Sequence, residues 1–537
     1  MTTLKSIVLA GSLALAACGG ASSPGLIGEA TAQSPGIFDQ LRNEAFSVSN
    51  GSPSDVDALF ALLPDGVTAS YGDVVFDADS GATTVSGLRF SIDDSPEIAL
   101  AIETLDLWGV DAARLQSGVE TGSAKIIDRV DAKGVSVTGL EEGFQTLTDA
   151  YVEGLTEGLA LDEDGAAALD FTFESYDLSV EQIILSGLTI HADDVGDAEI
   201  EDDGQAAIAA FAKALRSVSF DNAAAFGQVV GFKMTQAGIE QSFDYNIDLT
   251  GYAGYDRGDL AYTATRGMTI SGLTPFPDFT RIDEFSDDPD AQPPMIAIPV
   301  SGYARLQEWK NVRLSKALSY VVRAEAPPLD DTDLWSLGEM RLEEFNYALS
   351  GKDFLRMDAA TIDLTGFHWL LPSDIEADLS GFAYDFTGIK ELLPAIAAED
   401  GPEAAAFAVD LFDILEANNA LEFTIDANVS YEVDPETGNG VLNYQTKTRD
   451  WLSDTIAIEG QLPSFPAFSA FVDANGGLEG VDGDAFGDFF AAETSFNSAS
   501  YTLNDLGGLA RIFKLVVELA AVAPEDAAEL KGFANYT

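Results

Sequence analysis

Few residues of this chain have types and spacings that could support catalysis or metal binding. The 537-residue sequence contains one cysteine, Cys18, and two histidines, His191 and His368. A zinc site with so few nitrogen and sulfur ligands would need carboxylates for most of its coordination, which is uncommon. No Gly-x-Ser-x-Gly motif marks a nucleophilic serine. The sequence therefore predicts no metal, no cofactor and no enzymatic activity, and both histidines are interpreted as hydrogen-bonded or exposed residues.

Acidic turns are further candidates, because calcium prefers oxygen ligands. None of the acidic turns completes an EF-hand loop with its closing glutamate. The turns are Asp162-Glu163-Asp164-Gly165, Glu201-Asp202-Asp203-Gly204 and Asp473-Ala474-Asn475-Gly476. With 90 acidic residues, chance pairs of carboxylates are numerous, so a glycosidase-type pair stays open as an alternative. Solvated loops are the simpler interpretation of these turns.

The only cysteine lies directly after a short apolar segment. Ile7 to Ala17 follows Lys5 and is too short to span a bilayer comfortably, which is typical of a signal peptide. It ends in Leu15-Ala16-Ala17-Cys18, which resembles the lipobox of bacterial lipoproteins. The resemblance implies cleavage before Cys18 and anchoring through acyl chains on this residue. Gly19 implies sorting to the outer membrane. The alternative is an ordinary secretory signal with an unrelated cysteine.

The composition is strongly acidic, and this limits the possible partners. The chain carries 90 acidic residues against 27 basic ones, for a formal net charge of −63. Phosphate backbones and anionic headgroups would repel it, so neither nucleic-acid binding nor basic-patch membrane docking is expected. The acidic residues are spread along the sequence, which favours general solubility over one acidic binding face. The expected partners are the membrane, through the lipid anchor at Cys18, and other envelope proteins or lipids.

Short strand-like segments dominate the sequence from Val67 onward, and a small pattern recurs in them. The pattern is an apolar residue, Ser or Thr, Gly and another apolar residue. Its copies are Val85-Ser86-Gly87-Leu88, Val137-Thr138-Gly139-Leu140, Leu185-Ser186-Gly187-Leu188, Leu249-Thr250-Gly251-Tyr252, Ile270-Ser271-Gly272-Leu273, Val300-Ser301-Gly302-Tyr303, Leu364-Thr365-Gly366-Phe367 and Leu379-Ser380-Gly381-Phe382. Their irregular spacing indicates a meander of strands and not a solenoid.

The glycine of this pattern coincides with a change in the alternation of apolar and polar residues. The apolar positions are Ile375, Ala377 and Leu379 before Gly381, and Phe382, Tyr384 and Phe386 after it. A strand keeps one face buried across such a shift only if an extra residue is inserted. We therefore expect β-bulges with a left-handed glycine, tested at Gly366 and Gly381, that bend a long sheet. The alternative is that each glycine ends a strand.

These patterns predict an α+β fold: long, twisted, bulged and mainly antiparallel β-sheets with several amphipathic helices packed on them. Helices are expected at 38–46, 54–63, 141–161, 205–216, 403–417, 463–473, 484–492 and 509–521. The expected organisation is a signal peptide at 1–17, a lipidated cysteine and flexible tether at 18–36, a β-rich part with helices at 37–220, an antiparallel β meander at 221–386 and a mixed helix and strand part at 387–537. The last part lacks a clear closing element, which suggests that a further segment follows.

Three functional hypotheses remain open. The first, which we expect, is a non-enzymatic lipoprotein of the bacterial cell envelope, in the outer membrane, with a structural, assembly or interaction role. The second is a carrier of lipids or other hydrophobic ligands, with a cleft lined by Phe367, Trp369, Phe382 and Tyr384. In texture, though in no diagnostic motif, the body resembles the AsmA-like group of periplasmic proteins, which implies lipid handling along an apolar groove. The third is a hydrolase of an envelope polymer.

Each hypothesis predicts a different surface. A continuous apolar surface open to solvent favours the carrier. A closed core with flat polar faces favours the structural role. A cleft in which carboxylates of perturbed pKa converge favours the hydrolase.

Overall fold

The computed structural model describes residues 36–522 with several gaps. The gaps are 50, 62, 64–65, 94, 118, 120, 141–144, 146–170, 193–202, 237–238, 278–294, 329–330, 332, 368–371, 389, 391–401 and 478–479. Cys18 and its lipobox-like segment, most of the expected helix at 141–161, and the acidic turn at 162–165 therefore lie outside the described residues.

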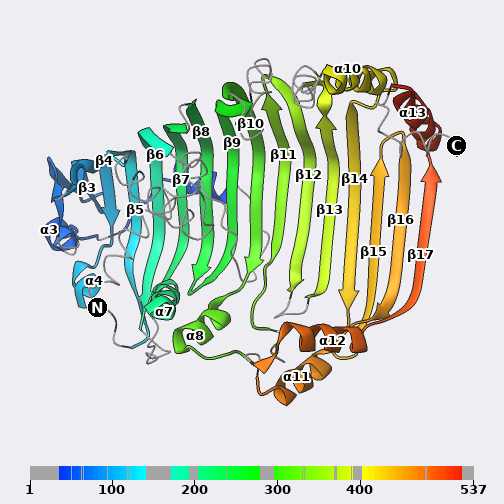
Figure 1. The fold of residues 1–537 in the computed structure, drawn as a ribbon. Coiled ribbons are helices and arrows are strands. Elements are labelled where there is room, and N and C mark those ends of the chain that lie inside the picture. Colours follow the sequence, from blue (N-terminus) through cyan, green and yellow to red (C-terminus); the bar gives the residue numbers. More distant parts are fainter. Residues whose placement is uncertain are drawn as a thin grey trace.

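The described residues form one sheet of 17 strands with helices around it (Figure 1). The strands are β1 (Val67–Ser70), β2 (Val74–Asp77), β3 (Ala82–Ile92), β4 (Ser95–Trp108), β5 (Ser123–Thr138), β6 (Phe171–His191), β7 (Val218–Gln236), β8 (Ile239–Asp256), β9 (Asp259–Pro277), β10 (Met295–Val312), β11 (Glu339–Leu349), β12 (Lys352–Phe367), β13 (Pro372–Asp385), β14 (Glu422–Val433), β15 (Asn439–Thr448), β16 (Leu452–Gln461) and β17 (Ser495–Asp505). The helices are α2 (Gly36–Asn43), α3 (Val56–Phe60), α4 (Ala112–Ser117), α7 (Asp203–Arg216), α8 (Ser315–Arg323), the 3-10 helix η2 (Phe386–Gly388), α10 (Pro402–Ala417), α11 (Phe465–Ala474), α12 (Gly483–Glu493) and α13 (Gly508–Val522).

The sheet is an antiparallel meander in which each strand pairs with the next one along the chain. This pairing runs from β3 to β17, and β1 and β2 lie end to end beside β3. The sheet is open, with β1 and β2 at one edge and β17 at the other. The α+β, mainly antiparallel fold expected from the sequence is confirmed. Of the expected internal boundaries, 220 falls within β7, and β13 and β14 pair across 386.

The two faces of the sheet differ in chemistry because apolar and polar residues alternate along the strands. In β15, Leu442 and Tyr444 lie on one face and Asn443 on the other, and the pairing with β14 and β16 continues both sets in register. We call these the apolar face and the polar face. In strands β13 to β17 the apolar face contains Ile375, Ala377, Leu379, Phe382, Tyr384, Val429, Tyr431, Leu442, Tyr444, Ile456, Ile458, Ala499 and Tyr501.

A transverse row of interrupted pairings crosses the sheet from β3 to β13. In each pair of neighbouring strands, the two residues of this row face each other without regular backbone pairing. The regular antiparallel pairing continues directly before and after them. The row consists of Gly87, Glu103, Gly134, Glu181, Gly227, Asp248, Gly267, Arg305, Glu344, Asp358 and Gly381. On alternate strands its residue is left-handed, with φ between 49° and 64°, and on the strands between them it is charged.

This transverse row lets every strand change its alternation at the same level of the sheet. Val85 and Leu88 lie on either side of Gly87 and belong to the same buried cluster. Because both partners of a pair change phase together, most strand pairs keep their register across the row. The residues of the apolar face of β3 to β13 therefore stay on the same side of the sheet on both sides of the row.

The predicted bulges are present at both test positions. Between β13 and β14 the register shifts between Leu379 and Phe382, and Gly381 has a φ of 63°. Between β12 and β13 the register shifts around Gly366, but this glycine is not left-handed. The predicted bulges are thus confirmed at both places, whereas a left-handed glycine is confirmed only at Gly381.

Helix α2 packs on the polar side of the sheet, across β6 to β10. Phe38 is completely buried and its ring stacks on that of Tyr262, with 5.9 Å between the centroids. Gly251 lies beneath this ring, and a Cβ there would come within 2.7 Å of it. Arg129 of β5 donates a 3.0 Å hydrogen bond to the carbonyl oxygen of Leu41. The N-terminal helix thus covers the apolar patch of an otherwise polar face.

An ion pair adds a pH-dependent contribution to this helix. Arg266 donates two 2.8 Å hydrogen bonds to the Asp39 carboxylate, and these bonds hold the pKa of Asp39 below its usual value. Because the folded pKa is the lower one, this stabilisation is present at neutral pH and disappears as the pH falls through that value. Both side chains are partly exposed, so we expect a contribution of about 0.5 kcal/mol. Urea unfolding at neutral and acid pH should show a smaller acid loss for Asp39→Asn than for the natural chain, and equal losses would contradict this assignment.

Candidate functional site

From β12 to β16 no described helix lies over the middle of the apolar face, whereas at one strand end α10 and α13 pack against Phe423, Trp451 and Leu452. The described helices near these strands, α10 to α13, lie at the strand ends (Figure 1). The side chains are half-buried by their neighbours within the sheet, as for Leu379, Val429 and Leu442. At the edge strand the exposed fraction rises to 63% for Tyr501 and 77% for Phe496. A continuous apolar surface of several strands is therefore available to a ligand.

Aromatic rings form a row on this face near one end of the strands. The ring centroids are 6.1 Å apart for Phe354 and Tyr384, 5.0 Å for Phe382 and Tyr384, 6.1 Å for Tyr384 and Phe386, 6.4 Å for Phe386 and Phe423, and 5.4 Å for Phe423 and Trp451. We call these six residues the aromatic row. Offset and edge-to-face contacts of this kind stabilise ring pairs beyond their burial alone.

The structure brings together two of the four residues predicted to line a cleft. Phe382 and Tyr384 are neighbours in the aromatic row, and Tyr384 is 37% exposed. Phe367 is the last residue of β12 and pairs with Pro372, at the opposite end of the hairpin from Tyr384. Trp369 lies outside the described residues. The aromatic surface therefore extends from Phe382 and Tyr384 toward β14 and β16, and not toward Phe367.

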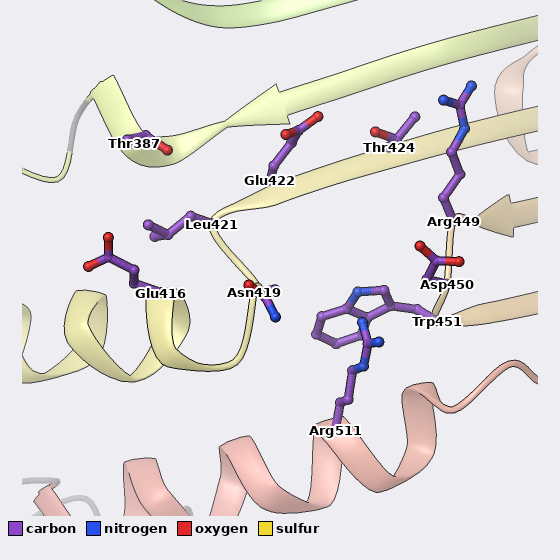
Figure 2. Close-up of a pocket in the computed structure, with 10 residues that line it drawn as sticks. All are labelled: Thr387, Glu416, Asn419, Leu421, Glu422, Thr424, Arg449, Asp450, Trp451 and Arg511. Atoms are coloured by element: carbon purple, nitrogen blue, oxygen red, sulfur yellow. The ribbon is translucent and has the colours of Figure 1, made fainter.

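A pocket of about 470 Å³ opens beside the end of the aromatic row. Figure 2 shows its residues, which come from η2, the end of α10, the start of β14, the β15–β16 turn and the first turns of α13. Trp451 belongs to both sites, because its ring contacts Phe423 and the guanidinium of Arg511 lies 5.8 Å from its centroid. The apolar face and the polar pocket thus meet at Trp451.

Most charges around this pocket are already paired. Glu416 accepts from Lys390 at 2.5 Å, and Glu422 pairs with Arg356. Arg449 lies 3.4 Å from Asp426. Among the described residues, Arg511 makes no ion pair with a carboxylate, so its guanidinium is the cation available to a ligand.

The carboxylate of Asp426 connects this region to the transverse row. Gly381 donates a 2.8 Å backbone hydrogen bond to Asp426, and this bond, followed by the interaction with Arg449, holds the pKa of Asp426 below its usual value. Asp426 and Arg449 therefore have a structural role at the bulge. They are poor candidates for acid–base catalysis.

The pKa values of tyrosines on the apolar face reflect the low polarity of their surroundings. Burial raises the pKa of Tyr245, Tyr347 and Tyr431 above the usual value of a phenol. The cause in each case is mainly desolvation, which disfavours the charged phenolate. The apolar environment therefore extends along the sheet from β8 to β14.

The other candidates for chemistry do not form a site. His191, the last residue of β6, contacts the hydroxyl oxygens of Ser123 at 2.9 Å and Ser219 at 2.8 Å through its two ring nitrogens. A catalytic triad would place a carboxylate on the second nitrogen, whereas Asp256 lies 3.9 Å from the same nitrogen as Ser219. His368 lies outside the described residues. Within the described ranges, no three His, Cys, Asp or Glu side chains converge as metal ligands.

Sequence reasoning missed two members of the site, Trp451 and Arg511. Neither stands in a motif, and they come from different elements, the β15–β16 turn and α13. Phe423 and Phe386 were detectable, because each continues an alternating apolar pattern on its own strand. Only the pairing of β13 to β16 shows that these patterns join.

No family model, curated protein or solved structure matches this chain. Among the residues described, no helix has the length and apolar character required to cross a membrane.

Proposed function

We propose that this protein is a non-enzymatic lipoprotein of the bacterial outer membrane that holds hydrophobic ligands of the acyl-chain class on the apolar face of its sheet. The uncovered middle of the apolar face from β12 to β16 carries the proposal. Exposed apolar area costs about 25 cal/mol per Å² relative to burial. Large contiguous patches are therefore rare on soluble proteins unless a ligand or partner covers them.

Acyl chains suit this face because they need no hydrogen-bond partners. Its side chains are mostly aliphatic and aromatic, and the one polar pair named by the register of β15 and β16 is Thr446 with Asp454, which hydrogen-bond each other. The nearest polar pocket lies at the strand ends. A ligand whose chain lies on the aromatic row would bring its headgroup to Trp451 and Arg511. A guanidinium without a carboxylate partner fits an anionic group in that headgroup.

The location in the envelope rests on the sequence. Leu15-Ala16-Ala17-Cys18 resembles a lipobox, and a diacylated cysteine would hold the chain at a membrane surface. The charge of −63 opposes direct contact of the body with anionic headgroups. We therefore propose that Cys18 anchors the protein while the sheet itself stays off the membrane surface.

The first experiment is lipid mass spectrometry of the protein from Gly19 to Thr537, secreted into a bacterial periplasm and purified without detergent. We expect stoichiometric phospholipid or fatty acid. A protein free of lipid would contradict the carrier function and would leave a structural or assembly role as the better proposal.

A matched pair of variants on β15 tests the face itself. Leu442→Asp places a carboxylate on the apolar face, and we expect about a tenfold loss of bound lipid, because burying an unpaired charge against acyl chains is strongly unfavourable. Asn443→Asp places the same charge on the polar face of the same strand and should retain lipid. Equal retention by both variants would show that the ligand lies elsewhere.

A further inference from the structure

The edge strand β17 lacks the usual protection of an exposed sheet edge. Among the described strands it pairs with β16 alone, and all of its residues are exposed. Natural edges are commonly blocked by lysine, proline or very short length. β17 spans 11 residues, contains neither lysine nor proline, and carries one charge, Asp505, at its end. Within the described part of the chain, no strand pairs with its outward backbone groups, which can therefore accept another strand.

Exposed apolar helices lie at both ends of this strand. α12 leads into β17 and has no buried residue, and Phe486 on it is 40% exposed. α13 follows β17 and exposes Leu509, Phe513 and Val517, which are spaced one turn apart. Figure 1 shows α12 at the lower end of β17 and α13 at the upper end.

The two helices are also complementary in charge. α12 carries Asp484, Asp488 and Glu493 and no basic residue. α13 carries Arg511 and Lys514 against one acid, Glu518. α13 is therefore net basic within a chain whose net charge is −63, and it lies at the opposite end of β17 from the acidic α12.

We infer that β17 is the interface for a second copy of this chain, which pairs antiparallel to it about a two-fold axis at Ser500. Antiparallel pairing inverts the second copy along the strand, so α13 of each copy comes to the level of α12 of the other. The axis sets Ser500 opposite itself in the regular part of β17, because the bulge at Asn497 interrupts the register beyond Ser498. It leaves the two Asp505 residues at opposite ends of the pair. The only charges on the strands are thereby kept apart.

This pairing also continues the apolar face across the interface. The axis between antiparallel strands is perpendicular to the sheet, so each face stays on the same side in both copies. Ala499 of one copy lies opposite Tyr501 of the other, which places a small residue against a large one. The inference rests on the edge strand and its two helices, and it shares only Arg511 with the proposed ligand site.

The test uses two differently tagged full-length chains expressed in the same cells and solubilised in a non-ionic detergent. We expect the natural copies to co-purify. Ser500→Lys in both copies should lower recovery about tenfold, because two lysines would face each other across the axis. Pairing one copy carrying Ser500→Lys with one carrying Ser500→Glu should restore it. Asn443→Lys, on the same face but two strands inside the sheet, should have no effect.

A covalent test checks the register. Ser500→Cys should give a disulfide-linked dimer on a non-reducing gel, whereas Asn443→Cys should not, because the latter cannot reach its counterpart. Ser500 is exposed in the single chain, so circular dichroism should show an unchanged fold for all Ser500 variants. Failure of the natural copies to co-purify, or equal recovery for Ser500→Lys, would overturn the inference. Finding that a different protein pairs with β17 in all purified molecules would also overturn the inference.

Discussion

Replacing Gly381 with valine is expected to lower the apparent free energy of unfolding by about 3 kcal/mol, because a β-branched residue is strongly disfavoured in the left-handed region. Gly381 has a φ of 63°, and a Cβ at this position would lie 2.1 Å from a carboxylate oxygen of Asp358 and 2.9 Å from its Cβ. The substitution thus combines backbone strain with a steric conflict between neighbouring strands. Urea unfolding followed by circular dichroism would measure it.

Two controls separate the left-handed backbone from the general cost of losing a glycine. Gly381→Asn meets the same Asp358 side chain but tolerates the left-handed backbone, so it should cost about 1 to 2 kcal/mol less than Gly381→Val. Gly487→Ala lies in helix α12, where a Cβ meets nothing within 4 Å, and should be neutral or stabilise by up to about 1 kcal/mol. If Gly381→Val lowers the free energy of unfolding no more than Gly381→Asn does, the transverse row does not depend on left-handed residues.

The importance of this row lies in what it does for the apolar face. A strict alternation through the long strands would turn the apolar residues to the polar side beyond the row. The left-handed residues prevent this on alternate strands, and the charged residues between them cover the glycines, as Asp248 covers Gly267 and Glu181 covers Gly227. The same row therefore sets the continuity of the surface proposed to bind ligand.

Part of this arrangement could be predicted from the sequence of a single strand. The shift from Leu379 to Phe382 is visible in the sequence and correctly predicted a bulge at Gly381. The pairing of an acid on a neighbouring strand with Gly134, Gly227, Gly267 and Gly381 was not predictable. Glu181 and Gly227 are far apart in the sequence, and only the strand register brings them together.

The helices show where pattern reasoning succeeds and where tertiary packing overrides it. The helix expected at 205–216 is present as α7, but its apolar stripe is not the buried one. Ile208 and Phe211 are 61% and 62% exposed, while Ala209 and Ala212 are buried. Small residues permit closer packing than the large ones that dominate a hydrophobicity pattern, so the pattern alone indicates a different face from the one that is buried.

Helix starts were similarly predictable only to within a residue or so. The helix expected at 54–63 begins with Ser54, a residue type that commonly caps helix N-termini. The observed α3 starts after Asp55, whose carboxylate accepts a 2.9 Å hydrogen bond from the backbone of Ala58. Serine and aspartate are both good N-caps, so sequence alone could not choose between them.

Truncating Phe38 to alanine should destabilise the protein by about 3 to 5 kcal/mol, the usual cost of removing a fully buried aromatic ring. The ring fills the space above Gly251 and stacks against Tyr262, so its removal leaves a cavity between α2 and the sheet. Gln40→Ala, on the exposed side of the same helix, should change stability by less than about 0.5 kcal/mol.

Because α2 packs on the polar side, Phe38→Ala should leave lipid binding per folded molecule unchanged. Loss of lipid from the folded variant would mean that the two faces of this single-layer sheet are energetically coupled.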